Sequence, residues 1–424
     1  MTILLLTGEF PPQQGGVGDY SNLLAQALIA QGQRVEIMTT RPAAADVQAP
    51  AAADALRPAV TVTRWDWRVW PAVVAAIRQI QPAVVLIQYQ TAAFGLHPAV
   101  NLLPGWLRLR LGRRRPRLIT TFHDLKFPYL FPKAGPLRLA AVRLLAQQSD
   151  AAIATNVEDW HALQRWGLPP FADRAAGRSP GRPVAMIPIG SNIACAPPTG
   201  FERDAWRGAW GLGHNDWLLC YFGFLNASKG GDALIACLAH LLQDGRPAHL
   251  LMIGGQVGSS DPTNQSYLEH VRRRIAELGL QGRVHWTGFV SADEVSAHLL
   301  AADVCVLPYQ DGAGRSRGSL MAGLAHGLPI VTTQPAAPLP GFSDGVNVYF
   351  TPAASAETLA AAVSDIMTNP VLRTRLASGA RALSQQYTWP AIAGQHNTLF
   401  SACLELHPES TEGQSSEEFV SANK

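Results

Sequence analysis

The chain contains two successive series of short, β-rich apolar runs, with helical patterns between the runs. The first series comprises residues 3–8, 35–40, 84–90, 118–124, 151–156 and 185–191, and the second comprises 218–225, 249–255, 284–290, 304–309 and 329–333. Near-continuous apolar runs are typical of strands in a parallel sheet that is covered on both faces. The helical stretches between them have the lengths of right-handed crossovers. The pattern predicts an α/β protein.

A proline- and glycine-rich stretch without a sustained apolar period, residues 192–215, separates the two series. We interpret this stretch as a linker between two Rossmann-like parallel-sheet domains, residues 1–191 and 216–385. Ligands of open α/β sheets bind at the carboxyl ends of the strands, so two facing domains would enclose a ligand in a cleft. The polar tail, residues 408–424, is expected to be disordered.

Composition narrows the class of partner. The net charge is only +3 over 424 residues, which argues against nucleic acid as the main ligand. The five cysteines are scattered and include no CxxC pair, so neither a disulfide framework nor a zinc site is indicated. The chain has no apolar run long enough to span a membrane, and its amino terminus is typical of a strand and not of a signal peptide. We predict a cytoplasmic protein.

One segment is strongly basic and also apolar. Residues 106–117 contain Trp106 and three leucines together with six arginines: Arg108, Arg110, Arg113, Arg114, Arg115 and Arg117. Such a segment can lie on the inner, anionic face of a membrane as a peripheral contact, where each cation contributes about 1 kcal/mol. The alternative is a solvated loop that leads into the strand at residue 118.

Two strand–loop–helix motifs carry features of phosphate sites. Residues 8–28 place Gly15, Gly16 and Gly18 just before a helix, whose free N–H groups suit a phosphate, although the spacing does not fit the dinucleotide fingerprint. Residues 220–232 place Lys229 at a helix start. Only four of the 34 basic residues are lysines, and a cation at a helix amino terminus opposes the helix dipole. The position of Lys229 therefore favours a diphosphate ligand over a solvated surface role.

Polar residues also end two strands of the first series. Gln88, Tyr89 and Gln90 end one strand, and His123 and Asp124 end the next. These side chains would face the predicted cleft, where a histidine can bind a sugar hydroxyl or a phosphate. Each can equally be a structural hydrogen-bonding residue.

The strongest phosphate signal is the glycine-rich turn at residues 307–333. Arg315, Arg317, Gly318 and Ser319 form a donor-rich turn into a short helix. No Asp-x-Asp triplet occurs in the sequence, so the usual carboxylate pair for a metal on a nucleotide diphosphate is missing. Arginine, lysine and helix dipoles would then neutralise the phosphates, without a metal.

These motifs, in this order, resemble retaining glycosyltransferases of family 4, which have the GT-B fold. The resemblance covers about residues 3–406 and rests on GEFPPQQGGVGDYS, TTFHD, GFLNASKGGD, VHWTGFV with ADVCVLP, and AGLAHGLPIV. The segment 386–407 looks like the family's last helix, which crosses back to the first domain. The resemblance implies transfer from a nucleotide-diphosphate sugar, with no cofactor or metal, to a sugar, glycolipid or lipid-linked acceptor.

The resemblance also implies site residues. It assigns His123 to the transferred sugar and Lys229 to the donor diphosphate, with Gly16 approaching that diphosphate through its backbone. The nucleobase would contact the main chain of Gly288, Phe289 and Val290. The first domain would hold the acceptor, which we predict to contact the following polar residues: Asp19, Tyr20, Gln88, Tyr89 and Asp124.

The chain departs from the family pattern at three positions. Phe224 stands where the family commonly has a diphosphate-binding arginine, and Gly314 and Ala322 stand where it commonly has two glutamates. We infer that Arg315 or Arg317 supplies the missing positive charge, aided by Gly318 and Ser319. Asp311 would take over recognition of sugar hydroxyls, which makes His123, Lys229 and Asp311 the predicted catalytic residues.

These residues favour a retaining transferase of cell-surface polysaccharide or glycolipid synthesis. Cations and N–H groups that face the departing diphosphate stabilise the transition state more than the ground state. The alternatives are a sugar-nucleotide epimerase or phosphorylase on the same fold, a catalytically decayed sugar-nucleotide-binding protein, and a non-catalytic two-domain solute-binding protein.

Overall fold

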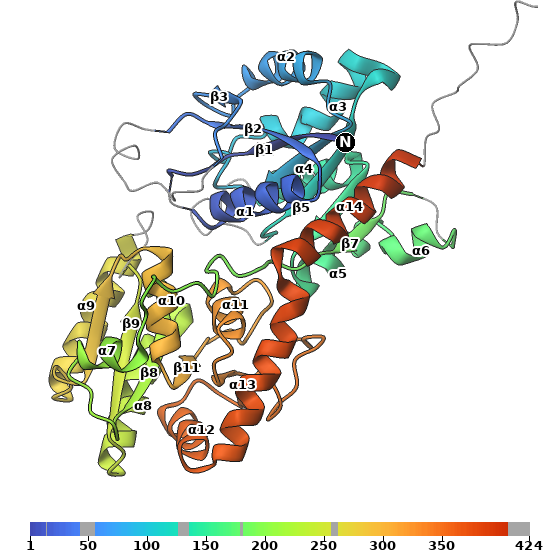
Figure 1. Ribbon diagram of the computed structural model, residues 1–424. Coiled ribbons are helices and arrows are strands. Elements are labelled where there is room, and N and C mark those ends of the chain that lie inside the picture. Colours follow the sequence, from blue (N-terminus) through green and yellow to red (C-terminus); the bar gives the residue numbers. More distant parts are fainter. Residues whose placement is uncertain (14, 43–55, 126–134, 179–180, 256–261, 406–424) are drawn as a thin grey trace, which may run out of the picture. The chain divides into compact units, whose positions relative to one another are not determined.

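The structure is a computed structural model that describes residues 1–13, 15–42, 56–125, 135–178, 181–255 and 262–405 (Figure 1). The chain divides into two compact units. Unit 1 comprises Met1–Ile187 and the carboxy-terminal residues from Ala393, and unit 2 comprises Pro188–Ile392. The predicted tail, 408–424, lies outside the described residues.

Unit 1 contains a parallel sheet of seven strands in the order β3-β2-β1-β4-β5-β6-β7. The strands are β1 (Thr2–Thr7), β2 (Arg34–Thr40), β3 (Val60–Val62), β4 (Val84–Tyr89), β5 (Arg117–Phe122), β6 (Ala151–Ala154) and β7 (Val184–Met186). The helices are α1 (Gly16–Ala30), α2 (Val69–Ile80), α3 (Ala99–Leu111), α4 (Gly135–Gln148), α5 (Val157–Arg165) and α6 (Phe171–Ala175), with the 3-10 turn η2 (Gly112–Arg114). All six residues of β4 are buried, which explains its apolar run from Val84 to Ile87.

Unit 2 repeats this topology with six parallel strands in the order β10-β9-β8-β11-β12-β13. The strands are β8 (Trp217–Phe222), β9 (Ala248–Ile253), β10 (Val284–Gly288), β11 (Val304–Leu307), β12 (Ile330–Thr333) and β13 (Tyr349–Thr351). Its helices are α7 (Arg203–Gly208), α8 (Gly231–Gln243), α9 (Pro262–Glu277), α10 (Ala292–Ala301), α11 (Gly318–Ala325), α12 (Ala356–Thr368) and α13 (Pro370–Ser384), with the 3-10 turns η4 (Ala227–Lys229) and η5 (Gln385–Tyr387). In each unit the strand order reverses beside the first strand, the usual place of a ligand site.

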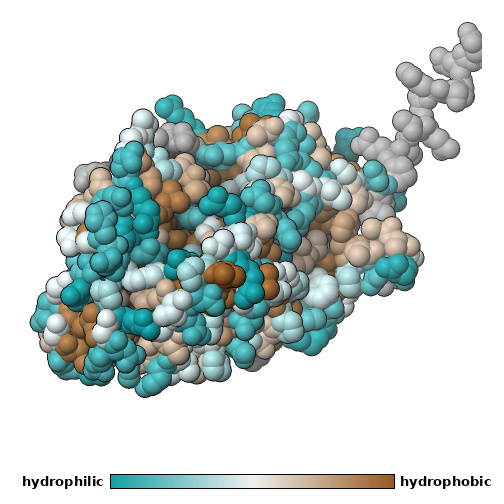
Figure 2. Space-filling model, turned by 60° about the horizontal axis from the view of Figure 1, so that its bottom comes forward, coloured by the Kyte–Doolittle hydropathy of each residue, from teal (hydrophilic) through white to brown (hydrophobic). Residues whose placement is uncertain are grey.

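Helices cover the sheet in layers. In unit 1, apolar side chains of α2, α3 and α4 pack on one face, against alternate residues of β1, β4 and β5. The opposite face carries the intervening residues, among them Thr7, Gln88 and Thr121. Hydrophobic side chains on the surface shown in Figure 2 lie among hydrophilic ones, as is usual for a folded domain.

The segment that we predicted to be a linker, 192–215, belongs to unit 2, and the boundary between the units falls at Ile187. Helix α7 lies within the segment, and its Arg207 is buried. The Arg207 guanidinium donates to Asp303 Oδ2 at 3.0 Å and to the Ala301 carbonyl at 3.0 Å. These hydrogen bonds hold the segment in unit 2. The glycine and proline content of the segment, from which we predicted a linker, does not indicate such contacts.

Helix α14 (Trp389–Glu405) begins in unit 2 and belongs to unit 1 from Ala393 onward. In unit 2, Trp389 donates its indole N–H to the Ser191 carbonyl at 2.8 Å. In unit 1, Asn397 donates to Gln31 at 2.8 Å. None of the helices in the described ranges is long and apolar enough to cross a membrane.

Candidate functional site

Lys229 lies at the carboxyl end of β8, in the loop that leads into α8. Gly223, directly after β8, has φ +117°, and a methyl group there would lie 3.3 Å from Lys229 Nζ. The lysine side chain therefore folds back over the strand end. Gly230 has φ +71°, and a Cβ atom there would collide with the Pro308 carbonyl. These two glycines allow the loop to hold Lys229 at the sheet edge.

Among the described residues, the charge of Lys229 has no acidic counterpart. Within the part of the chain that the structure describes, Nζ forms no hydrogen bond and no ion pair, although the side chain is half-buried. Burial and the nearby positive charge of Arg317 lower the pKa of Lys229 to about 8. An uncompensated, partly buried ammonium beside a guanidinium is a strong attractor for an anion.

Arg317 is fixed by two contacts. Its guanidinium forms an ion pair with Asp311 and lies 4.8 Å from the ring centre of Tyr309. The Tyr309 hydroxyl, in turn, lies 2.7 Å from Ser319 Oγ, at the start of α11. Burial raises the pKa of Tyr309 well above its ordinary value, so the hydroxyl stays neutral. The chain of contacts ties Arg317 to the amino terminus of α11.

The amino terminus of α11 is open. No side chain caps the helix, and the backbone N–H groups of Gly318 and Ser319 form no hydrogen bond with any described residue. These donors and the two cations of Lys229 and Arg317 belong to the same edge of the unit 2 sheet. The sequence predicted this combination, and its geometry suits a phosphate.

Two predicted roles on this loop stay predictions, and the structure gives the surroundings of each residue. Arg315 lies 5.5 Å from the ring centre of Tyr387, in η5, so Arg317 and not Arg315 is the arginine beside Lys229. Asp311 is exposed, but its carboxylate is paired with Arg317. A sugar hydroxyl would have to compete with that ion pair, so the predicted role of Asp311 in sugar recognition lacks a free carboxylate.

The positions that depart from the family pattern lie in different surroundings. Ala322 is fully buried in α11, whereas Phe224 is 40% exposed. A Cβ atom at Gly255 would lie 2.7 Å from Phe224 Cε1, so the ring lies against the chain just after β9.

At the end of β10, Gly288 has φ +69° and Phe289 is 61% exposed, while Val290 is half-buried. Their predicted contacts with a nucleobase remain predictions.

In unit 1 the start of α1 is already occupied. Glu9 Oε1 accepts hydrogen bonds from the N–H groups of Val17 at 3.0 Å and Gly18 at 3.2 Å. A Cβ atom at Gly15 would collide with this carboxylate, whereas one at Gly16 would have no atom within 4 Å. Gly16 therefore borders open space, as its predicted role requires. Sequence reasoning missed Glu9 because no spacing rule links it to the helix start.

His123 is held beside α1. Its Nε2 lies 2.8 Å from Gln88 Oε1, and the Tyr20 ring meets the imidazole edge to face, with centres 4.7 Å apart. Burial, with a smaller effect of His396, lowers the pKa of His123 to about 3. The imidazole is therefore neutral at physiological pH.

Three residues that we predicted to contact the acceptor have buried side chains, and their contacts with an acceptor stay predictions. Tyr20 is 5% exposed, Gln88 0% and Tyr89 1%. The Tyr89 hydroxyl accepts a hydrogen bond from Asn101 at 2.8 Å, inside the core. Asp19 is half-buried and Asp124 is exposed, and their contacts with an acceptor remain predictions.

Asp159, at the start of α5, is a second residue that the sequence did not single out. Its carboxylate accepts from Asn156 Nδ2 at 2.8 Å and from the Leu125 N–H at 3.3 Å. Burial, and to a lesser extent the negative charge of Asp124, raises the pKa of Asp159 to about 6. The buried carboxyl thus anchors the backbone two residues after His123. Its sequence signal was the Asn-x-x-Asp pattern at a helix start.

The Arg-rich segment is helical and not a loop. It forms the end of α3 and the turn η2. Arg108 donates to the Gln148 carbonyl, and Arg115 forms a hydrogen-bonded ion pair with Asp150 at 2.7 Å. Three other arginines are exposed: Arg110, Arg113 and Arg114.

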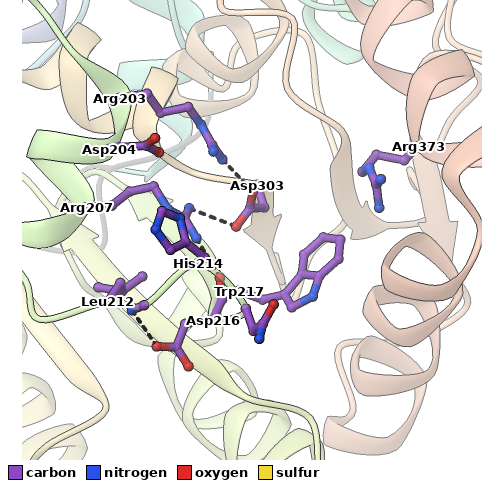
Figure 3. Close-up of a pocket in the computed structure, with 11 residues that line it drawn as sticks. Arg203, Asp204, Arg207, Leu212, His214, Asp216, Trp217, Asp303 and Arg373 are labelled. Atoms are coloured by element: carbon purple, nitrogen blue, oxygen red, sulfur yellow. Dashed lines mark hydrogen bonds and ion pairs between the residues drawn. The ribbon is translucent and has the colours of Figure 1, made fainter.

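A pocket of about 490 Å³ lies at the opposite edge of the unit 2 sheet, where β8 and β11 begin (Figure 3). Arg203 and Arg207 both donate to Asp303, and Arg373 lies over the Trp217 ring at 5.1 Å. The negative charge of Asp303 is thus neutralised by the two arginines. Among the described residues, no group of three His, Cys, Asp or Glu side chains could hold a metal ion.

Comparison with protein families agrees with both units. A model of the group 1 glycosyl transferases matches residues 202–383, and a model of glycosyltransferase family 4 matches residues 14–172. The chain belongs to the group 1 glycosyltransferases of family 4 type. The predicted family is thereby confirmed.

Proteins that are similar to this glycosyltransferase over most of its length are themselves named as glycosyltransferases. A GDP-mannose-dependent α-(1-6)-phosphatidylinositol monomannoside mannosyltransferase of Mycolicibacterium smegmatis is 24% identical, over 87% of this chain and 90% of that protein. A D-inositol 3-phosphate glycosyltransferase of Xylanimonas cellulosilytica is 27% identical, over 93% of each chain. The crystal structure of HepE of Anabaena, in complex with UDP and glucose, shares the fold with a TM-score of 0.70 and 18% identity, over 95% of this chain and 100% of that chain. The glycosyltransferase therefore has the predicted GT-B fold.

Proposed function

We propose that this glycosyltransferase moves a sugar from a nucleotide-diphosphate sugar to an acceptor, with retention of anomeric configuration and without a metal ion. The observation that carries the proposal is the pair of cations at the edge of the unit 2 sheet. Lys229 has no acidic partner among the described residues, Arg317 lies beside it, and the N–H groups that begin α11 are open. The named relatives, which include a GDP-mannose-dependent enzyme, support this donor class.

The residues suggest how the reaction is assisted. As the bond to the sugar breaks, negative charge grows on the leaving diphosphate, and Lys229, Arg317 and the α11 N–H groups would stabilise it. Because these groups are held by the fold before the reaction, little reorganisation is needed. In a same-face displacement, the leaving phosphate would help to take the proton of the acceptor hydroxyl, which gives retention without an enzymic nucleophile.

The test is turnover of a panel of GDP-, UDP- and ADP-sugars with inositol phosphate and phosphoinositide acceptors, in the presence of EDTA. We expect the nucleoside diphosphate to be released only when an acceptor is present, and the product to keep the donor's anomeric configuration by NMR. Isomerisation of the donor without an acceptor would instead identify an epimerase. Activity that EDTA abolishes, and added Mg²⁺ restores, would contradict the metal-independent mechanism.

We further propose that the enzyme works at the cytoplasmic face of an anionic membrane, in glycolipid or cell-surface polysaccharide synthesis. The Trp70 ring lies 5.1 Å from Trp67 and 5.1 Å from Trp106, and Arg110 lies 5.9 Å from the Trp106 ring. Leu109, in the same helix as Trp106, is 82% exposed. Partly exposed tryptophans beside arginines are typical of surfaces that bind a bilayer interface.

Flotation with vesicles of phosphatidylglycerol and phosphatidylcholine tests this surface. Removing the charge of its three exposed arginines (Arg110, Arg113 and Arg114) by substitution with Gln should weaken binding by about 3 kcal/mol, at about 1 kcal/mol per cation. The matched control replaces three exposed arginines of α9 in unit 2, Arg272, Arg273 and Arg274, in the same way. Equal losses in the two variants would mean that binding follows net charge and not this surface.

A further inference from the structure

Three buried polar side chains lie side by side on three neighbouring strands of unit 1. Thr7 of β1 pairs with Gln88 of β4, and Gln88 pairs with Thr121 of β5. All three side chains are fully buried. His123 directly follows β5, and its imidazole contacts the Gln88 side chain of this row. The row thus leads to the edge where His123 stands.

The side chain of Gln88 contacts the His123 ring and bears on where the imidazole carries its proton. Its carbonyl oxygen Oε1 lies 2.8 Å from His123 Nε2, and its Nε2 has no hydrogen-bond partner among the described residues. In this orientation of the Gln88 amide, the carbonyl oxygen faces the ring and can only accept a hydrogen bond, which places the proton on His123 Nε2. Because a neutral imidazole carries a single N–H, Nδ1 is left with a lone pair.

The surroundings of His123 favour this neutral form. Burial disfavours the imidazolium, with a smaller electrostatic effect of His396, and the Tyr20 ring flanks the imidazole. Within the described residues, Nδ1 forms no hydrogen bond. A lone pair accepts a hydrogen bond from a hydroxyl group but repels a phosphate oxygen, which is itself an acceptor.

We propose that Gln88 is a positioning residue that holds His123 as the Nε2–H tautomer, so that Nδ1 accepts a hydrogen bond from a hydroxyl group of the transferred sugar. The inference rests on the proposed function and sharpens it. Of the two ligands that the sequence left open for His123, a sugar hydroxyl fits and a phosphate does not. Gln88 acts through His123 and does not touch the substrate.

The first test needs no donor. NMR spectra of protein labelled with ¹⁵N-histidine should show His123 protonated at Nε2 and not at Nδ1. Gln88→Leu should lose this preference, and Gln88→Glu, which keeps an acceptor oxygen, should retain it. Thr121→Val is the matched control, because it removes a buried hydroxyl from the same face without touching His123. An Nδ1–H tautomer in the wild type, or an unchanged tautomer in Gln88→Leu, would overturn the proposal.

The second test uses donor analogues in which each sugar hydroxyl is replaced in turn by hydrogen or by fluorine. Fluorine can accept a hydrogen bond but cannot donate one. At one position we expect both analogues to lower kcat/KM by about three- to tenfold, the range for one lost hydrogen bond. In Gln88→Leu the same replacements should cost less. A fluoro analogue that retains full activity at every position where the deoxy analogue fails would show that His123 donates.

The two tests separate this inference from the proposed function. If the wild type turns over no nucleotide sugar, the proposed function fails, while the NMR result still reports on Gln88 and His123. If turnover is normal and the tautomer is the opposite one, the proposed function stands and the role of Gln88 is wrong.

Discussion

Unit 1 and unit 2 have the same strand order around their first strand, yet the helix that follows a glycine-rich loop begins very differently in the two. In unit 2, the N–H groups that begin α11 bond to no described residue, Lys229 lies beside Arg317, and among the described residues Asp311 alone forms an ion pair with Arg317. In unit 1, the start of α1 is filled by Glu9. The topology supplies a helix start at a strand edge, and the side chains decide whether it attracts an anion.

The titratable side chains near these two helix starts also differ in charge between the units. His123 in unit 1 is kept neutral by burial, whereas Lys229 and Arg317 in unit 2 are cations. A neutral site suits a sugar or another uncharged group, and a cationic site suits a diphosphate. The comparison therefore assigns different chemistry to two edges that a fold description alone would treat as equivalent.

The prediction with the largest expected effect removes Lys229, which has no acidic partner among the described residues of unit 2. Lys229→Ala should lower kcat/KM by about 30- to 1,000-fold, since one preorganised stabiliser of developing charge contributes about 2 to 4 kcal/mol. Steady-state kinetics with the preferred donor measures the effect. Arg274→Ala removes an exposed cation from the same unit and should leave kcat/KM unchanged. Near-normal turnover in Lys229→Ala would remove Lys229 from the site.

How far the sequence predicted these features depends on the range of the interactions involved. Apolar runs and glycine-rich turns are local, so the two sheets and the loops of Lys229 and Arg317 could be predicted. Strands β3 and β13 were not predicted, because each is three residues long and lies outside the apolar runs. We predicted acceptor contacts for Tyr20, Gln88 and Tyr89 because these residues lie close to the end of a strand or the start of a helix. Whether such a side chain turns inward depends on contacts such as Gln88 with His123, which are distant in sequence.

A second test removes the Glu9 carboxylate from the start of α1 in unit 1. Glu9→Ala removes two charge-assisted hydrogen bonds and should lower the free energy of unfolding by about 2 kcal/mol. Glu9→Gln, which keeps an acceptor oxygen, should lower it less. Denaturant unfolding monitored by circular dichroism measures both. Because the emptied site would then resemble α11, sulfate should stabilise Glu9→Ala more than the wild type. Equal stabilisation of both proteins would show that Glu9 does not exclude an anion.

A third test follows the charge of Lys229 with pH. Its pKa of about 8 means that the ammonium is present below pH 8 and is lost above it. We expect kcat/KM to fall about tenfold for each pH unit above the pKa, since this parameter reports ionisations of the free enzyme. Lys229→Arg keeps its charge at high pH, so its profile should stay flat up to pH 10. The same decline in both proteins would assign the titration to another group.

The smallest effect concerns Asp159 of unit 1, a buried carboxyl that forms no ion pair with any described residue. Its folded-state pKa of about 6 exceeds the ordinary 3.8, so the protonated form is favoured by folding. This contribution to stability is complete below pH 3.8 and is lost as the pH rises through 6. Asp159→Asn keeps an oxygen for the Leu125 N–H without the charge, and should therefore raise stability by about 1 kcal/mol at pH 7. Below pH 4 the two proteins should unfold at the same denaturant concentration. A gain that is equal at both pH values would mean that the buried charge is not its cause.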